Sequence, residues 1–214
     1  MPVTTIPMLN VALAFIPVLV VLFVMFRWSL AISDSFVALG RMVIQLLVIG
    51  YALTWIFVVD SPVLVLGLLS TMLLMASSIA LRPVADHKVQ GDYARALVSI
   101  ACGGGVTLAF TSYFVLTLDP WYKANTMIPL AGMIFASSMN AVSVAAERLY
   151  METKHGSPIT LARNQAFKAG LIPIFNSLLA VGLVSLPGMM TGQILSGISL
   201  SLIHISEPTR HRSI

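Results

Sequence analysis

The side chains that could do chemistry in this sequence are a few amide and hydroxyl groups inside long apolar runs. Ser137 and Asn140 lie in one such run, and Asn176 lies in another, three residues after Pro173. An amide oxygen can line a polar path, and a proline frees a backbone carbonyl that needs a partner or water. These residues are candidates for a substrate pathway, while helix packing and interhelical hydrogen bonding are the simpler explanation.

A second polar segment follows the last long apolar run. It reads LPGMMTGQILSG, in which Pro187 and Gly188 break a helix. Met189, Met190 and Gln193 come next and join the candidate pathway residues. Thioethers suit soft metals such as Cu(I) and poorly suit iron or aluminium. Because the chain has 12 methionines, packing is the more frequent role for them, and these residues indicate no particular metal.

Other residues of the apolar runs have structural interpretations. Arg41 and Gln45 are four residues apart and share one helix face, where the arginine can reach the interface or form a polar entrance. Gly132, Ala136 and Asn140 form a small-residue stripe on which another helix can pack closely. The triplet Gly103–Gly105 also favours close packing over a bend. The predicted structural residues are Arg41, Gln45, Pro129, Gly132, Pro173, Pro187 and Gly188.

Motifs of catalysis and nucleotide binding are missing from the sequence. There is no GxxxxGK[ST] loop, no HExxH helix and no GxSxG turn. No acidic or basic side chain lies in the middle of an apolar run, which argues against a proton relay. The single cysteine, Cys102, allows neither a disulfide nor a cysteine zinc site. We therefore expect no catalytic residues and no cofactor bound by this chain.

The composition decides the class of protein in which these residues act. The chain has 214 residues, of which 58% are hydrophobic and only 9% are charged. An ordinary soluble domain has about 25% charged residues. So few charges could not cover a water-soluble globule, and the absence of polar low-complexity tracts excludes a disordered chain. The sequence predicts a polytopic membrane protein.

Six charge-free runs are long enough to cross a hydrocarbon core of about 30 Å as helices. They are continuously apolar, whereas barrel strands would alternate polar and apolar residues. The fold class is therefore an all-α bundle of transmembrane helices. The six predicted spans are Met8–Phe26, Met42–Val59, Pro62–Leu81, Ala96–Leu118, Thr126–Ala146 and Ala169–Pro187.

The net charge of +4 is explained by topology and needs no nucleic acid partner. The first, third and fifth connections with their borders carry nine Lys and Arg residues, against Lys123 alone in the second and fourth. Positive residues stay in the cytoplasm, so these three connections are cytoplasmic and the N-terminus is outside. The nine are Arg27, Arg41, Arg82, Lys88, Arg95, Arg148, Lys154, Arg163 and Lys168.

The connections between spans predict further local structure. Asp60 and Ser61 alone separate spans two and three, which predicts a tight outer hairpin. Trp28–Leu39 is expected to form a short interfacial helix on the inner leaflet. The long fifth connection, Glu147–Lys168, contains Ser157 as an N-cap before a proline, which predicts a short cytoplasmic helix leading into span six. That helix is either a solvated loop element or a docking helix for a cytoplasmic partner.

Three motifs resemble a known family over about Met8–Gly197. They are GRMVIQLLVIGY from Gly40, MIPLAGMIFASSMNAVS from Met127 and AGLIPIFNSLLAVGLVSLPGMMTGQILSG from Ala169. The third motif is long and specific, and the order and spacing agree. The chain resembles the FetB-type family of bacterial iron-export ABC permeases, which is related to plant aluminium-tolerance permeases.

The resemblance implies a permease subunit for the export of iron or another metal. It implies that ATP is hydrolysed in a separate cytoplasmic ABC ATPase, that two permeases pair, and that the protein lies in the bacterial inner membrane among lipids. The stretch TLARNQAFKAGLIP looks like the coupling region, so Arg163 and Lys168 are expected to contact the ATPase, together with Arg148 from the start of the fifth connection. The alternatives are a stand-alone channel or secondary carrier for metals or small solutes, and a non-transporting membrane scaffold.

The sequence departs from the family pattern in its last part and in its fifth connection. The family continues into a seventh span, whereas here Leu200 replaces a proline and SLIHISEPTRHRSI follows. We expect residues 1–199 to form the permease domain and residues 200–214 to be a non-native tail. The fifth connection is shorter than the family's, and Phe135–Ser137 stand where the family has small residues and often an asparagine.

Overall fold

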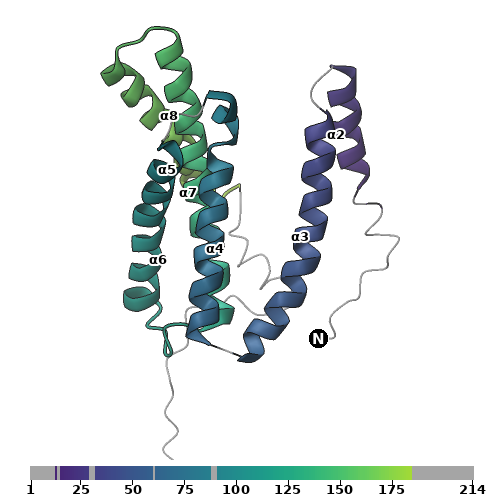
Figure 1. Ribbon diagram of the computed structural model, residues 1–214, viewed down its shortest axis with the longest axis vertical. Coiled ribbons are helices and arrows are strands. Elements are labelled where there is room, and N and C mark those ends of the chain that lie inside the picture. The colour runs from purple at the N-terminus through teal and green to yellow at the C-terminus, as the bar shows by residue number, and fades with distance from the viewer. Residues whose placement is uncertain (1–12, 14, 29–31, 60, 88–90, 185–214) are drawn as a thin grey trace, which may run out of the picture. The chain divides into compact units, whose positions relative to one another are not determined.

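The computed structural model describes residues 13, 15–28, 32–59, 61–87 and 91–184. These residues belong to two compact units, one from Gly50 to Leu179 and one made of the chain before and after it. All elements of the described chain are helices (Figure 1). They are α2 (Ile16–Arg27), α3 (Ile32–Val59), α4 (Pro62–Ala80), η1 (Arg82–His87), α5 (Asp92–Ile100), η2 (Ala101–Gly105), α6 (Val106–Phe110), η3 (Thr111–Val115), α7 (Ala124–Lys154) and α8 (Ile159–Ala180).

The all-α membrane fold predicted from the sequence is confirmed. Four helical stretches are long and apolar enough to cross a membrane, and they coincide with predicted spans two to five. These stretches are Ser35–Val59, Pro62–Ala80, Asp92–Val115 and Ala124–Lys154. For span one, the described residues form the 12-residue apolar helix α2. Span six begins within α8, which ends at Ala180, before the predicted end at Pro187. Residues 181–184 form a turn in which Gly182 has a φ of +86°, and residues 185–187 lie outside the described residues.

Two short helices expected beside the spans are instead continuous with them. The interfacial helix expected over Trp28–Leu39 is replaced by α3, which starts at Ile32 and runs unbroken to Val59. The helix expected after Ser157 continues through Pro173 as the single helix α8. Single glycines and polar residues lower helix stability by at most about 1 kcal/mol each, so they do not end a helix by themselves.

The fifth connection is much shorter than the predicted Glu147–Lys168. Helix α7 continues to Lys154, and only residues 155–158 separate it from α8. The added turns contain good helix formers and an ion pair between Arg148 and Glu152 one helical turn apart, at 2.6 Å. Gly156 then ends the helix, because its φ of +80° is a left-handed conformation that glycine adopts without steric cost.

The core of the Gly50–Leu179 unit lies where α4 packs on α7 and α5, which run alongside one another (Figure 1). Val65, Ile100 and Ala131 are completely buried there. The helical path from Asp92 to Val115 includes two π-helical turns, η2 and η3. At Gly104, inside η2, a Cβ atom would lie 2.9 Å from the Phe135 ring, which supports the predicted packing role of the glycine triplet at this residue.

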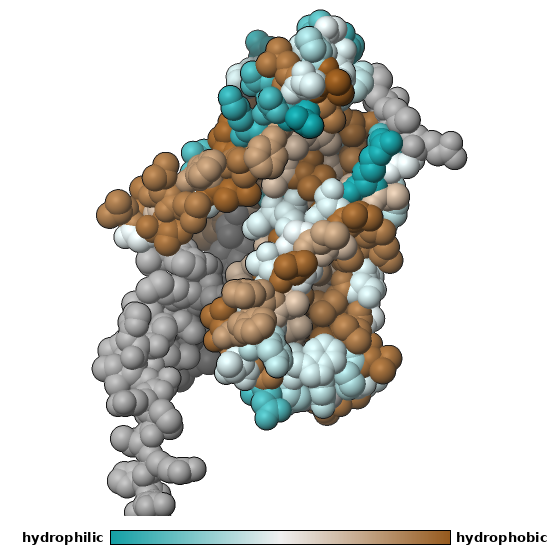
Figure 2. Space-filling view, turned by 90° about the vertical axis from the view of Figure 1, so that its left-hand side faces the viewer, coloured by the Kyte–Doolittle hydropathy of each residue, from teal (hydrophilic) through white to brown (hydrophobic). Residues whose placement is uncertain are grey.

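The surface of the long helices is unusually apolar. Val58, Val63 and Tyr113 are more than 70% exposed, and no soluble fold would present such rows of large apolar side chains to water. Figure 2 shows most of the strongly hydrophilic residues toward the end where α7 meets α8, fewer at the opposite end, and a surface of mixed intermediate and hydrophobic residues between the two. This distribution fits helices that face lipid and a polar end that faces water.

Candidate functional site

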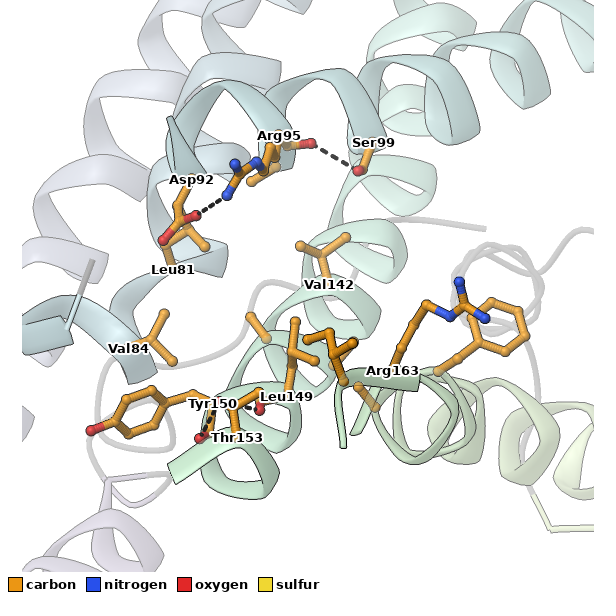
Figure 3. Close-up of a pocket in the computed structure, with 16 residues that line it drawn as sticks. Leu81, Val84, Asp92, Arg95, Ser99, Val142, Leu149, Tyr150, Thr153 and Arg163 are labelled. Atoms are coloured by element: carbon orange, nitrogen blue, oxygen red, sulfur yellow. Dashed lines mark hydrogen bonds and ion pairs between the residues drawn. The ribbon is translucent and has the colours of Figure 1, made fainter. Parts of the chain in front are cut away.

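A cavity of about 520 Å³ lies at the polar end of the Gly50–Leu179 unit (Figure 3). Its walls come from the end of α4, from η1 and α5, and from α7 and α8. Most lining side chains are apolar, among them Leu81, Val84, Val142 and Leu149. Among the described residues the cavity therefore brings together two of the three connections that the charge distribution assigns to the cytoplasm, the third and the fifth.

The α5 wall of the cavity carries a fixed ion pair. Arg95 donates from Nη1 to the Asp92 carboxylate at 2.9 Å, one turn apart at the start of α5. The carboxylate lies in the positive field of the helix N-terminus, which stabilises it further. Ser99 donates to the Arg95 carbonyl at 2.8 Å, so its hydroxyl is engaged within the helix (Figure 3).

The opposite wall combines an aromatic ring with further basic groups. Tyr150 of α7 lines the cavity, and the Lys154 ammonium lies 5.8 Å from the centre of its ring, within range of a cation–π interaction. Arg163 of α8 also lines the cavity and makes no hydrogen bond or ion pair with another described residue. Figure 3 shows Arg95 and Arg163 coming from helices on either side of the cavity. The site is therefore basic at its edge and apolar within.

The turn from α7 to α8 is held by one carboxylate. Glu152 pairs with Arg148 at 2.6 Å through one oxygen and accepts a hydrogen bond from the Ser157 hydroxyl at 2.8 Å through the other. The Ser157 amide also donates to the Glu152 carbonyl at 3.1 Å. Ser157 thus closes the end of α7 instead of capping α8 with its side chain. Of the expected coupling residues, Arg148 is engaged in this network, Arg163 faces the cavity and Lys168 is exposed on α8.

The predicted pathway residues within the described chain lie on exposed helix surfaces. Ser137 and Asn140 are exposed on α7, and Asn176 is exposed on α8. None of the three lines the cavity. In a membrane protein such faces meet lipid, another part of the chain or a second subunit. The predicted residues Pro187, Gly188, Met189, Met190 and Gln193 lie outside the described residues.

The predicted structural residues occupy several environments. Arg41 and Gln45 are exposed on α3, and Pro129 and Pro173 lie inside α7 and α8. A Cβ atom on Gly132 would lie 3.5 Å from the Met72 methyl carbon, an ordinary contact between α7 and α4. Ala136 and Asn140, the next members of the predicted stripe, are exposed.

A second small-residue stripe, on α8, was not singled out from the sequence. Ala162, Ala166 and Gly170 are buried and four residues apart. A Cβ atom on Gly170 would lie 2.9 Å from the Ala141 carbonyl oxygen on α7 and 3.2 Å from the Ala145 Cβ. The i, i+4 spacing of small residues was the available signal. The charges that surround the stripe favour a solvated loop in the sequence and so mask this signal.

No group of three or more His, Cys, Asp or Glu side chains that could hold a metal ion occurs within the described residues.

The chain matches the family described as "Uncharacterised protein family (UPF0014)" over residues 8–160 and 157–202. These matches cover nearly the whole length. The chain belongs to the UPF0014 family.

Curated relatives of this UPF0014 chain come from bacteria and plants. It is 34% identical to the UPF0014 membrane protein slr1647 of Synechocystis, over 74% of this chain and 66% of the relative. It is 31% identical to the probable iron export permease protein FetB of Escherichia coli, over 88% of this chain and 77% of the relative. It is 29% identical to the protein ALUMINUM SENSITIVE 3 of Arabidopsis thaliana, over 90% of this chain and 74% of the relative. The chain thus spans about two thirds to three quarters of the length of these relatives.

The comparisons confirm the resemblance to FetB-type permeases and the assignment to a membrane. No solved structure matches this UPF0014 chain.

Proposed function

We propose that this UPF0014 chain is the membrane permease subunit of an ABC-type exporter of iron or another metal, driven by a separate ATPase. The observation that carries the proposal is the similarity to the probable iron export permease FetB over 88% of the chain. The sequence contains no phosphate-binding loop, so ATP hydrolysis belongs to another subunit. The metal is the substrate, and the chain itself binds no cofactor.

The coupling to the ATPase is assigned to the polar end of the Gly50–Leu179 unit. The α7–α8 turn, residues 155–158, joins two long helices, and the Glu152 network holds it. Because α8 continues from this turn as one helix, a force applied at the turn would be transmitted along α8 as far as Pro173. Arg148, Arg163 and Lys168 are the proposed contacts or supports for the ATPase.

The substrate path is assigned to faces that become covered when two permeases pair. Ser137, Asn140 and Asn176 are polar and exposed in the single chain, and their hydroxyl and amide oxygens can bind a hydrated cation. Met189, Met190 and Gln193 complete the proposed path. Pro129 and Pro173 interrupt hydrogen bonding in α7 and α8 and serve as pivots between inward- and outward-open states.

The test is reconstitution of the permease with its cognate ATPase in vesicles loaded with Fe²⁺. We expect ATP-dependent efflux that disappears when the ATPase carries a substitution in its phosphate-binding lysine. Efflux from vesicles containing the permease alone, without ATP, would instead establish a channel or secondary carrier. Absence of metal efflux under both conditions, together with metal-independent ATPase turnover, would refute metal export.

A further inference from the structure

The basic, apolar-walled cavity at the polar end is the feature that metal export leaves unexplained. Two guanidinium groups line it, and one carboxylate, that of Asp92, already accepts from Arg95. The Lys154 ammonium adds a third cation at the Tyr150 ring. This arrangement repels a divalent cation and attracts an anion.

The depth of the cavity in the membrane follows from the helices that form it. On α7 the lining extends from Val142 to Thr153, a rise of about 16 Å, and so passes from the apolar span into the charged end. On α5 the lining includes Asp92 and Arg95, which lie at the beginning of the membrane-spanning stretch Asp92–Val115. The cavity therefore lies at the level of lipid headgroups, on the side that the Lys and Arg residues assign to the cytoplasm.

The apolar part of the site calls for a hydrocarbon occupant. Ile159 and Phe167 line the cavity and are 66% and 67% exposed, although both lie on the charged half of α8. Large apolar side chains exposed beside an excess of cations suit an amphiphile, which covers the apolar wall and neutralises the charge.

From this geometry we infer that the cavity binds one anionic phospholipid of the inner leaflet. Its phosphate is held between Arg163 and Arg95, since a guanidinium group donates two parallel hydrogen bonds to phosphate oxygens. An acyl chain lies along Leu149, Ile159 and Phe167. Basic pockets between transmembrane helices on the cytoplasmic side recognise lipid headgroups in this way. A bound lipid would bridge α5 and α8 and so stabilise the end that is proposed to contact the ATPase.

The experiment measures retention of phosphatidylglycerol by the full-length chain in mild detergent, using native mass spectrometry, with phosphatidylcholine as the neutral probe. We expect preferential retention of phosphatidylglycerol and a loss of about fivefold for Arg163→Gln and for Arg95→Gln, since each cation near a lipid contributes on that scale. Arg163→Lys keeps the charge and should retain most of the binding. Arg27→Gln is the matched control, because Arg27 lies at the end of α2 and does not line the cavity.

Further measurements distinguish a bound phospholipid from a soluble anion and from a partner protein. Inorganic phosphate at millimolar concentration should not displace the lipid, whereas displacement would identify a soluble anion site and overturn the proposal. Equal retention of both lipids, or Arg163→Gln behaving like the unaltered chain, would also overturn it. If Arg163→Gln loses only its association with the ATPase, then the cavity serves the partner protein instead. Circular dichroism of each variant verifies that it is folded. None of these outcomes depends on metal transport.

Discussion

Gly170 of α8 lies against the backbone of Ala141 on α7, so closely that a Cβ atom on Gly170 would come within 2.9 Å of the Ala141 carbonyl oxygen. A backbone atom cannot rotate away as a flexible side chain can, so an added methyl group must push the helices apart. Gly170 therefore sets how closely α8 approaches α7, and with it the geometry of the α7–α8 turn.

Replacing Gly170 by alanine should lower the stability of the bundle by about 1–3 kcal/mol, the usual cost of overpacking. The measurement is the thermal unfolding midpoint of the purified protein in detergent. Gly132→Ala is the matched control, because its Cβ would make an ordinary contact of 3.5 Å with the Met72 methyl carbon. Equal midpoints for the two variants would contradict the close crossing of α7 and α8.

A second substitution tests the contact between Gly104 and Phe135. Gly104→Ala should destabilise the protein by about 1–2 kcal/mol, because its Cβ would lie 2.9 Å from the aromatic ring. Gly103→Ala should not, since its Cβ position has no heavy atom within 4 Å. Adding Phe135→Leu to Gly104→Ala should recover part of the loss in a double-mutant cycle. Strict additivity would show that the two residues do not interact.

The carboxylate of Glu152 should control the order of the α7–α8 turn. Glu152→Ala removes the partner of both Arg148 and Ser157, and we expect a loss of about 1 kcal/mol and faster proteolysis at residues 155–158. Glu147→Ala, an exposed acidic residue on the same helix, is the control. Indistinguishable cleavage rates for the two variants would rule out this role.

Orientation in the membrane can be measured by cysteine labelling. In a Cys102→Ala background, Ser157→Cys should react with an impermeant maleimide only from the cytoplasmic side. Lys123→Cys should react only from the outside, because Lys123 precedes α7 at its opposite end. Labelling with the two sides exchanged would reverse the topology and would place the basic cavity at the outer leaflet.

The proposed substrate path predicts that amide oxygens at two positions contribute to transport. Asn140→Leu and Asn176→Leu should each reduce metal-stimulated ATPase turnover of the reconstituted complex by about tenfold, the scale of one or two lost polar contacts. Ser70→Ala is the control, because this α4 hydroxyl donates within its own helix to Leu66 at 2.8 Å. Unaltered metal stimulation in both asparagine variants would remove them from the path.

The local boundaries show where sequence reasoning was sufficient and where it was not. The end of α3 at Val59 and the start of α4 at Pro62 were predicted, because a proline favours the first helical turn. The end of α7 at Lys154 differs from the prediction, because a run of charged residues by itself also fits a loop. An amphipathic sequence with good helix formers and an i, i+4 ion pair, such as Arg148 and Glu152, remains helical in water.

The sequence by itself determined the membrane class, the location of the central spans and the family, because hydropathy and charge act on each segment separately. Only the tertiary structure decided that Arg95 and Arg163 line one cavity, and that Gly170 meets Ala141. Those relationships depend on how helices distant in sequence cross one another. In a membrane, such crossings are determined by close packing of small side chains, because contacts between helices replace equally apolar contacts with lipid.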